Sequence, residues 1–468
     1  MTALIHAAAV LSTAREVVPA RAQMATTLGF HIILACYGIA FPTIVLVAEY
    51  VGLKRSDEVA MTLARRWSQA LGVLVAVGAV TGTVLSFEMG LLWPGLMRKY
   101  GAAIGLPFSI EGIFFFLEAI FTGIYLYGWR RLSGWAHFWS GIPVAVSGIF
   151  GALSVMAANS WMNQPGGFTV RGRHIVAVEP WAVVFNRAAA YEMPHMVLAA
   201  YMVAGFGVAS VYAVGFLRGR RDRYHRLGFG IPFVLAAAVV PFQIFVGDTA
   251  ARAIAADQPV KFAAMEYVAH TSRGVPEYLG GVYEDGHVYL GVAIPDLDSL
   301  LVGFSPHAKV IGWDSVPPVD RPPAATLIHL SFDAMVALAF LLLGAGLWAL
   351  VAWRRRRALP ERRWFWWLAA ACGPAALVAM ECGWIVTEVG RQPWVVYRLL
   401  TTAAAATTNR GVIATLTAVI ILYAVLGVAT VLILRLLARR WRGGDEGEAS
   451  VPYGPPGRPP TPIAGEGR

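Results

Sequence analysis

The segment FSIEGIFFFLEAIFTGIYLYGW, from Phe108 to Trp129, carries two carboxylates, Glu111 and Glu118, in a run that is otherwise apolar and contains no Lys, Arg or His. The run is long enough to cross a bilayer as a helix. A charged side chain at membrane depth costs about 2.5 kcal/mol or more, so such residues normally face a protein interior or a wet path. Their seven-residue spacing is about two helical turns, which places both on one side of the helix, about 10 Å apart. The segment therefore predicts stations of a proton route or groups flanking a buried cofactor. Two protonated core carboxyls bonded to neighbouring helices are the structural alternative.

The whole chain has the composition of a membrane protein. Of its 468 residues, 57% are hydrophobic and 14% are charged, whereas soluble domains carry about 25% charge. Apolar stretches of spanning length occur near residues 26–52, 69–93, 105–129, 135–158, 194–217, 228–248, 326–353, 364–388 and 411–438. The pattern predicts an all-α, polytopic membrane protein with about nine transmembrane helices.

The distribution of Lys and Arg predicts how the helices are oriented. Basic residues follow the first, third, fifth, seventh and ninth stretches, and such loops stay on the cytoplasmic side. The N-terminus is therefore expected outside and the C-terminus in the cytoplasm. The expected organisation is six helices in residues 1–248, an extracytoplasmic segment at 249–325, three helices in 326–442, and a disordered cytoplasmic tail at 443–468.

The charge and cysteine content narrow the classes of function. The net charge of +10 is explained by this topology and by contact with anionic lipid, so nucleic-acid binding is not expected. The three cysteines all fall in predicted spans without CxxC or CxxCH spacing. This argues against a disulfide scaffold and against a covalently attached haem.

Five residues that can bind metal or protons are expected in the outer half of the membrane. They come from five separate helices and are His31, Glu111, His195, Met335 and Glu388. A His with a Met suits a six-coordinate electron-transfer haem, and a single axial ligand leaves an iron position open for oxygen. Non-haem iron or copper would also accept His with carboxylate, and a proton-coupled transporter also uses intramembrane acids.

The order of motifs resembles subunit I, the haem-bearing subunit, of the cytochrome bd family of quinol oxidases. The motifs are RAQMATTLGFH (21–31), VTGTVLSFEMG (80–90), SIEGIFFFLEA (109–119), ANSWMNQPGGF (158–168), PH (194–195), KFAAME (261–266) and GWIVTEVGRQPW (383–394). They span about residues 20–400, and the combination of GRQPW with a two-carboxylate third helix is specific.

The resemblance implies a role for each matching residue. It implies that His195 and Met335 are the axial ligands of a low-spin b-type haem, and that His31 and Glu388 are ligands of two high-spin haems. The cofactors are then two b-type haems and one haem d, or a third b-type haem in its place. The remaining implied site residues are Glu111 and Glu118, beside the high-spin pair and on its proton supply, Trp384 between haems, and Arg391 on a haem propionate.

The outer segment resembles the quinol-binding loop of the family. Lys261 and Glu266 match the pair implicated there in quinol oxidation, because a carboxylate can accept the quinol proton and an ammonium can hold the oxygen. Read without the resemblance, a Lys and a Glu in a loop are usually solvated surface charges.

Three features depart from the pattern of the family. Asp333 stands two residues before Met335, where the best-known members carry Arg, and an ionised acid there is expected to stabilise ferric over ferrous haem. Gly151 replaces a serine of the proton path, which Ser147 or Ser154 would have to substitute. The outer loop is comparatively short, and some members with this loop type carry haem b in place of haem d.

The sequence thus predicts a quinol:oxygen oxidoreductase in the bacterial cytoplasmic membrane. It would oxidise quinol at the outer face, reduce dioxygen to water at a di-haem centre, take protons from the cytoplasm and so generate a proton motive force. The resemblance also implies a subunit II of similar fold and a small single-helix subunit. The alternatives are a proton-coupled transporter, which needs no haem, and a b-type electron-relay cytochrome, which needs neither His31 nor Glu388.

Overall fold

The computed structural model describes residues 2–171 and 174–443, and side chains from residue 17 onward. Within this part of the chain, nine helices are long and apolar enough to cross a membrane, as the hydropathy pattern predicted. They are α1 (Thr2–Arg55), α2 (Glu58–Leu92), α3 (Pro94–Gly128), α4 (Gly134–Asn163), α6 (Ala189–Leu217), α7 (Arg223–Asp257), α10 (Ala325–Arg356), α11 (Arg363–Gly390) and α13 (Val412–Arg442). The predicted tail, apart from Gly443, lies outside the described residues.

Local sequence signals set the helix boundaries. The side chain of Asp57 accepts hydrogen bonds from the amides of Val59 and Ala60 at the start of α2, and Asp222 caps α7 in the same way. Capping by a short acidic side chain satisfies amides that the first turn leaves unpaired. Helices α1, α10 and α13 end in basic residues, which suit the negative end of the helix dipole.

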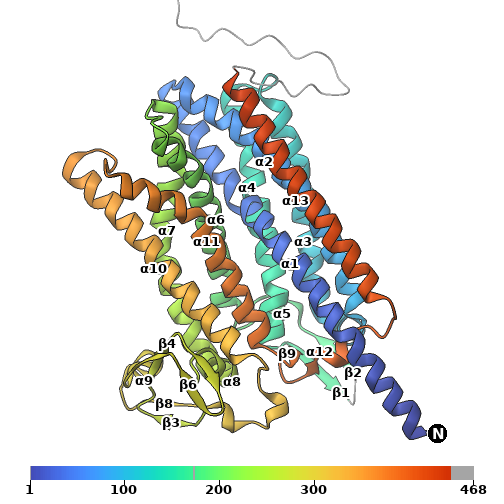
Figure 1. The fold of residues 1–468 in the computed structure, drawn as a ribbon. Coiled ribbons are helices and arrows are strands. Elements are labelled where there is room, and N and C mark those ends of the chain that lie inside the picture. The colour runs from blue at the N-terminus through green and yellow to red at the C-terminus, as the bar shows by residue number, and fades with distance from the viewer. Residues whose placement is uncertain (1, 172–173, 444–468) are drawn as a thin grey trace, which may run out of the picture.

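The helices pack in two groups joined through α1 and α4, which both contact α6 (Figure 1). One group consists of α1–α4, with α13 beside α1 and α2. The other consists of α6, α7, α10 and α11, and α1 contacts α6. Helices α1 and α4 approach closely, because a Cβ at Gly148 would lie 2.8 Å from the carbonyl oxygen of Gly38. Small residues allow such approach in membrane helices.

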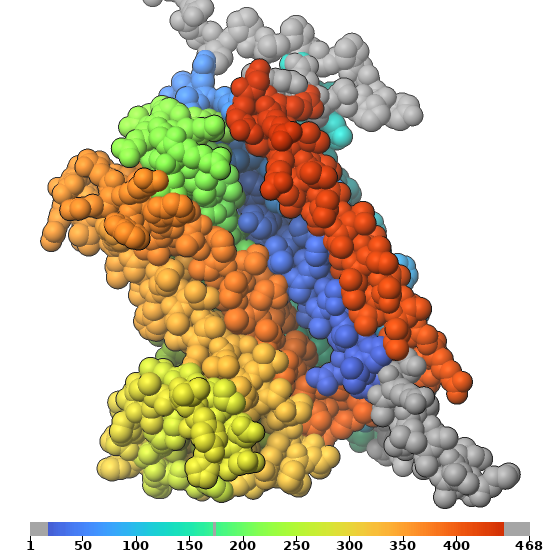
Figure 2. All heavy atoms as spheres, in the orientation of Figure 1, coloured from blue at the N-terminus to red at the C-terminus, as the bar shows by residue number. Residues whose placement is uncertain are grey.

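The short elements gather at one end of the bundle, opposite the basic helix ends. Between α7 and α10 the chain forms a lobe (Figure 2) of short helices and two-residue or three-residue strands. Its elements are α8 (Pro259–Met265), β3 (Ser272–Arg273), β4 (Glu277–Leu279), β5 (Val282–Glu284), β6 (His287–Tyr289), β7 (Val292–Ile294), α9 (Leu297–Gly303) and β8 (Lys309–Val310), with antiparallel pairs β3–β8, β4–β7 and β5–β6. The same end holds β1 (Phe168–Arg171), β2 (His174–Val178), α5 (Pro180–Val184), β9 (Trp394–Val396), β10 (Leu400–Thr401) and α12 (Thr402–Ala405).

Candidate functional site

The end of α11 that faces the lobe holds a carboxylate and a guanidinium in contact. Arg391 Nη2 lies 2.6 Å from Glu388 Oε2, and Arg391 is only 3% exposed. The other two guanidinium nitrogens, Nε and Nη1, are buried and have no hydrogen-bond partner. Buried donors of this kind are rare without a partner, so Arg391 can still hold an anionic group.

A polar network extends from Glu388 to two other helices. Asn159 on α4 donates to Glu388 Oε1 at 2.9 Å. Asn163, one turn further on, donates to Asn159 at 3.3 Å and to Glu192 of α6 at 2.8 Å. The network fixes the Glu388 carboxylate in one orientation, and Glu192 is a member that sequence reasoning did not find.

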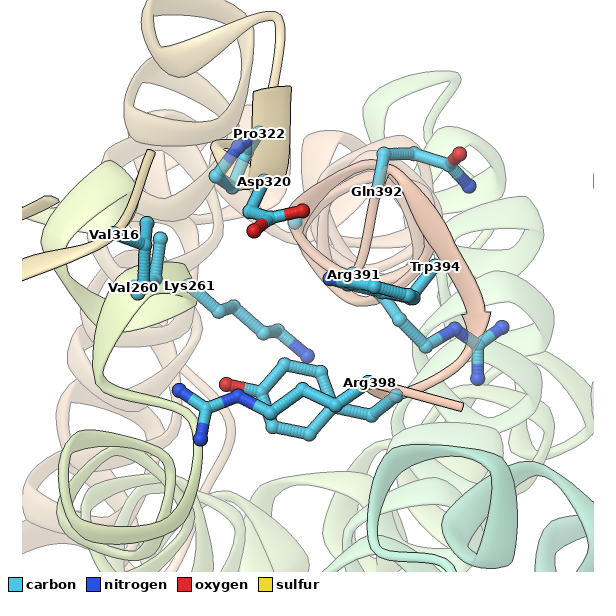
Figure 3. Close-up of a pocket in the computed structure, with 11 residues that line it drawn as sticks. Val260, Lys261, Val316, Asp320, Pro322, Arg391, Gln392, Trp394 and Arg398 are labelled. Carbon is cyan, nitrogen blue, oxygen red and sulfur yellow. The ribbon is translucent and has the colours of Figure 1, made fainter. Parts of the chain in front are cut away.

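Lys261 lies against the same end of α11. It is 3% exposed, and a Cβ on Gly390 would lie 3.0 Å from its Cγ. Burial lowers the pKa of Lys261 to about 8. Its ammonium points into a cavity of about 230 Å³ that Arg391, Trp394 and Arg398 also line (Figure 3). The carboxylate of Asp320 lines the cavity as well, so three cationic side chains and one acidic side chain meet between α8, residues 316–322 and the segment after α11.

Glu266 is buried as well, so neither member of the predicted pair is a solvated loop charge. Its exposed fraction is 3%, and its Oε2 has no hydrogen-bond partner. Burial raises the pKa of Glu266 well above its ordinary value, and Glu277 and Asp298 raise it further. Burial therefore favours the protonated form of Glu266, so a proton on this carboxyl is held more tightly than on an exposed glutamate.

His31 of α1 contacts α2, and Glu381 of α11 approaches a different side of α1. The ring Nδ1 of His31 is 2.9 Å from Thr81 Oγ1. A Cβ on Gly29, two residues before His31, would lie 3.6 Å from Glu381 Oε2, and Glu381 Oε1 is buried without a partner. Sequence reasoning missed Glu381, although it precedes Glu388 by the same seven residues that separate Glu111 from Glu118.

His195 and Met335 both lie beside glycines of neighbouring helices. A Cβ on Gly247 of α7 would lie 3.4 Å from the His195 ring, and one on Gly383 of α11 would lie 3.1 Å from Met335 Sδ. Gln243 Nε2 is 3.2 and 3.3 Å from the two ring nitrogens of His195. His195 and Met335 thus come from two helices, α6 and α10, that both pack on α11.

The two carboxylates of α3 are partly buried. A Cβ on Gly38 of α1 would lie 3.3 Å from Glu118 Oε1, which places Glu118 at the contact between α1 and α3. Trp384 packs against the core of the bundle, one residue after Gly383. Gly151, which replaces a serine of the family's proton path, faces Phe114 of α3. A Cβ added at Gly151 would lie 3.6 Å from the Cβ of Phe114.

The residues present fit haem. The site residues include His and Met, which are axial ligands of haem iron in electron-transfer proteins. A glycine of a neighbouring helix lies beside each of His31, His195 and Met335. Unpartnered donors of Arg391 suit a propionate. Among the described residues, no group of three or more His, Cys, Asp or Glu side chains gathers as a multi-ligand metal centre would require.

Nine membrane-length helices within the described ranges, together with such donors, are typical of a membrane-bound haem protein. A model of the family "Cytochrome bd terminal oxidase subunit I" matches residues 19–441. The chain belongs to this haem-containing family, and it is a multi-pass protein of the bacterial cytoplasmic membrane.

Individual relatives agree along most of the chain. The "Putative cytochrome bd menaquinol oxidase subunit I" of Bacillus subtilis is 33% identical, over 91% of this chain and 97% of the relative. The "Cytochrome bd ubiquinol oxidase subunit 1" of the same organism is 28% identical, over 84% and 86%. The solved structure of bd oxidase from Geobacillus thermodenitrificans has a TM-score of 0.84 and 36% identity, and the match covers 91% of this chain and 98% of that chain.

Proposed function

We propose that this protein is the haem-bearing subunit of a quinol:oxygen oxidoreductase that oxidises quinol at the lobe end of the bundle. The observation that carries the proposal is the packing of Lys261 against Gly390. It places a buried ammonium beside the helix end that holds Glu388 and Arg391, so the proposed quinol site and the proposed haem-ligand site share one wall.

Each residue at the lobe end has a separate role in the proposed oxidation of quinol. Lys261 holds a quinol oxygen, and Glu266 accepts the proton that this oxygen loses. The proposed axial ligands are His195 and Met335 for a low-spin b-type haem, and His31 and Glu388 for two high-spin haems, one of haem d or of a third haem b. These haems would pass the quinol electrons to oxygen. Trp384 would lie between haems, and Arg391 would hold a propionate.

In this proposal, protons are released at one face of the membrane and taken up at the other. By the positive-inside rule the lobe end lies outside and the basic helix ends lie in the cytoplasm. Protons from quinol leave outside, whereas reduction of dioxygen to water takes up protons that Glu118 and Glu111 deliver from the cytoplasm. This separation would generate a proton motive force. The working enzyme would also contain a subunit II of similar fold and a small single-helix subunit.

Substitution of the buried lysine tests the proposal. Lys261→Met should lower quinol oxidase turnover by about 100-fold, the scale of a lost catalytic group, while the haem spectrum stays unchanged. Lys309, an exposed lysine of the same lobe, provides the control Lys309→Met, which should keep full turnover. Full turnover of Lys261→Met with normal haem content would contradict the quinol site.

A further inference from the structure

A row of polar side chains continues from Glu118 toward the C-terminal end of α3, which Arg130 and Arg131 follow. Tyr125 follows Glu118 by seven residues, so Glu111, Glu118 and Tyr125 lie on one side of the helix. Thr122 lies between them, four residues after Glu118 and three before Tyr125. Side chains at these spacings are neighbours on a helix surface. From Glu118 to Tyr125 the groups are therefore about 4 to 6 Å apart along the axis, and Glu111 lies about 10 Å from Glu118.

Thr122 has a hydroxyl that the surrounding protein does not satisfy. The residue is 6% exposed, and its Oγ1 is buried without a hydrogen-bond partner. A buried hydroxyl can donate one hydrogen bond and accept two, and most buried polar groups are paired. Thr122 Oγ1 makes no hydrogen bond to Glu118 or to Tyr125, so its full hydrogen-bonding capacity is free for a relay between these two residues.

The row ends at a buried acid and base from two other helices. Tyr125 donates from its hydroxyl to Glu49 Oε2 of α1 at 2.5 Å, and Glu49 Oε1 lies 2.7 Å from His137 Nδ1 of α4. The three residues are 1–2% exposed. The second ring nitrogen of His137 lies 2.8 Å from the carbonyl oxygen of Tyr125. Both ring nitrogens of His137 therefore face oxygen atoms, one of α1 and one of α3, which holds the ring between the two helices.

The acid–base pair lies at the basic end of the bundle. Trp129 lies over the His137 ring with centroids 3.9 Å apart, and the guanidinium of Arg65, an exposed residue of α2, lies over Trp129. On α1, the nearby Lys54 donates to Tyr50. One aromatic ring therefore separates the pair from the face that the positive-inside rule assigns to the cytoplasm.

We propose that His137, Glu49, Tyr125 and Thr122 form the inner mouth of the proton path to Glu118. A proton from the cytoplasmic side is taken up at the His137–Glu49 pair, and the hydroxyls of Tyr125 and Thr122 each accept one proton and release another toward Glu118. Each relay group then ends in its starting state, so no charge accumulates and no oxidant is needed. The inference rests on the proposed function, since oxygen reduction is what consumes the protons.

Thr122 offers a matched pair of variants for the test. Thr122→Val keeps the size and removes the hydroxyl, whereas Thr122→Ser keeps the hydroxyl. When the fully reduced enzyme reacts with oxygen, a pH-indicator dye should show proton uptake slowed at least about tenfold in Thr122→Val. Uptake in Thr122→Ser should stay near that of the unsubstituted protein. Thr430 of α13 donates to the carbonyl of Leu426, and Thr430→Val is the control that should leave uptake unchanged.

A pH profile distinguishes a relay role from a structural one. With Tyr125→Phe or Glu49→Gln, proton uptake should limit turnover at lower pH than in the unsubstituted protein, so the fall in turnover with rising pH begins earlier. A purely structural role would reduce the yield of folded protein without moving this profile. An unshifted profile, or normal uptake in Thr122→Val, would overturn the inference while oxidase turnover remained. Absence of oxygen-consuming turnover in the unsubstituted enzyme would instead overturn the proposed function.

Discussion

Asp333 accepts a hydrogen bond from the backbone amide of Gly280 at 2.5 Å. The contact joins α10, two residues before Met335, to the loop that follows β4 of the lobe. His329, one turn earlier on α10, lies 2.5 Å from the Met265 carbonyl oxygen and 3.2 Å from that of Gly280. Hydrogen bonds therefore connect the proposed quinol-binding segment to the helix that carries Met335, the proposed ligand of the low-spin haem.

Asp333 provides a prediction about redox potential. A negative charge near haem favours the ferric state, so Asp333→Asn should raise the midpoint potential of the low-spin haem. Glu361 lies in the connection from the other end of α10 to α11, and Glu361→Gln is the control that should leave the potential unchanged. A redox titration followed at the absorption band of the low-spin haem would measure the midpoint potential of each variant. An unchanged potential in Asp333→Asn would count against the proposed position of this haem.

Met335 provides a prediction about ligation. Met335→Leu keeps the side-chain volume and removes the sulfur, so the low-spin haem should become five-coordinate and high-spin. Its low-spin signal in electron paramagnetic resonance should disappear. Met202→Leu, at a buried methionine of α6, should leave this signal intact. Retention of the low-spin signal in Met335→Leu would assign the sixth ligand to another residue.

The lobe is predicted to loosen at alkaline pH. Burial raises the pKa of Glu277 to about 7 and that of Asp298 to about 8, and the two carboxyls repel each other when ionised. In the unfolded chain such groups titrate near pH 4. The folded lobe therefore binds more protons than the unfolded chain, and its stability falls as pH rises from about 4 through 8.

Hydrogen exchange across the lobe tests whether its stability falls as the pH rises. After correction for intrinsic exchange rates, amides of residues 275–303 should exchange faster at pH 9 than at pH 6, while those of the α6 core should not. Glu277→Gln should reduce the difference. Equal protection at the two pH values would show that these carboxyls are not buried as described.

Much of the fold was predictable because hydropathy reports membrane spans directly. All nine predicted spans correspond to helices, but the helices are longer. Helix α7, for example, continues to Asp257, nine residues beyond the predicted end, since polar residues outside the apolar stretch still satisfy helix geometry. The short strands of the lobe carry no periodicity long enough to predict them.

The candidate site was predictable only in part. Motifs supplied Lys261, Glu266 and Glu388 by resemblance, and whether they act as assigned stays a prediction. Lys261 packs against Gly390, which lies 129 residues further along the chain. Local sequence patterns cannot reveal such a contact. The spacing of Glu381 and Glu388 was a usable signal, and so was the presence of Glu49 and His137 within predicted spans. Their pairing depends on the contact between α1 and α4.

The most direct test of the account is a visible difference spectrum of the purified chain with its proposed partner subunit. The dithionite-reduced minus air-oxidised spectrum should show b-type haem bands, and added carbon monoxide should shift the bands of a high-spin haem. A far-red band that responds to carbon monoxide would assign haem d, and its absence beside a responding b-type band would assign a third haem b. Absence of any haem absorbance from correctly folded protein would contradict the oxidase account.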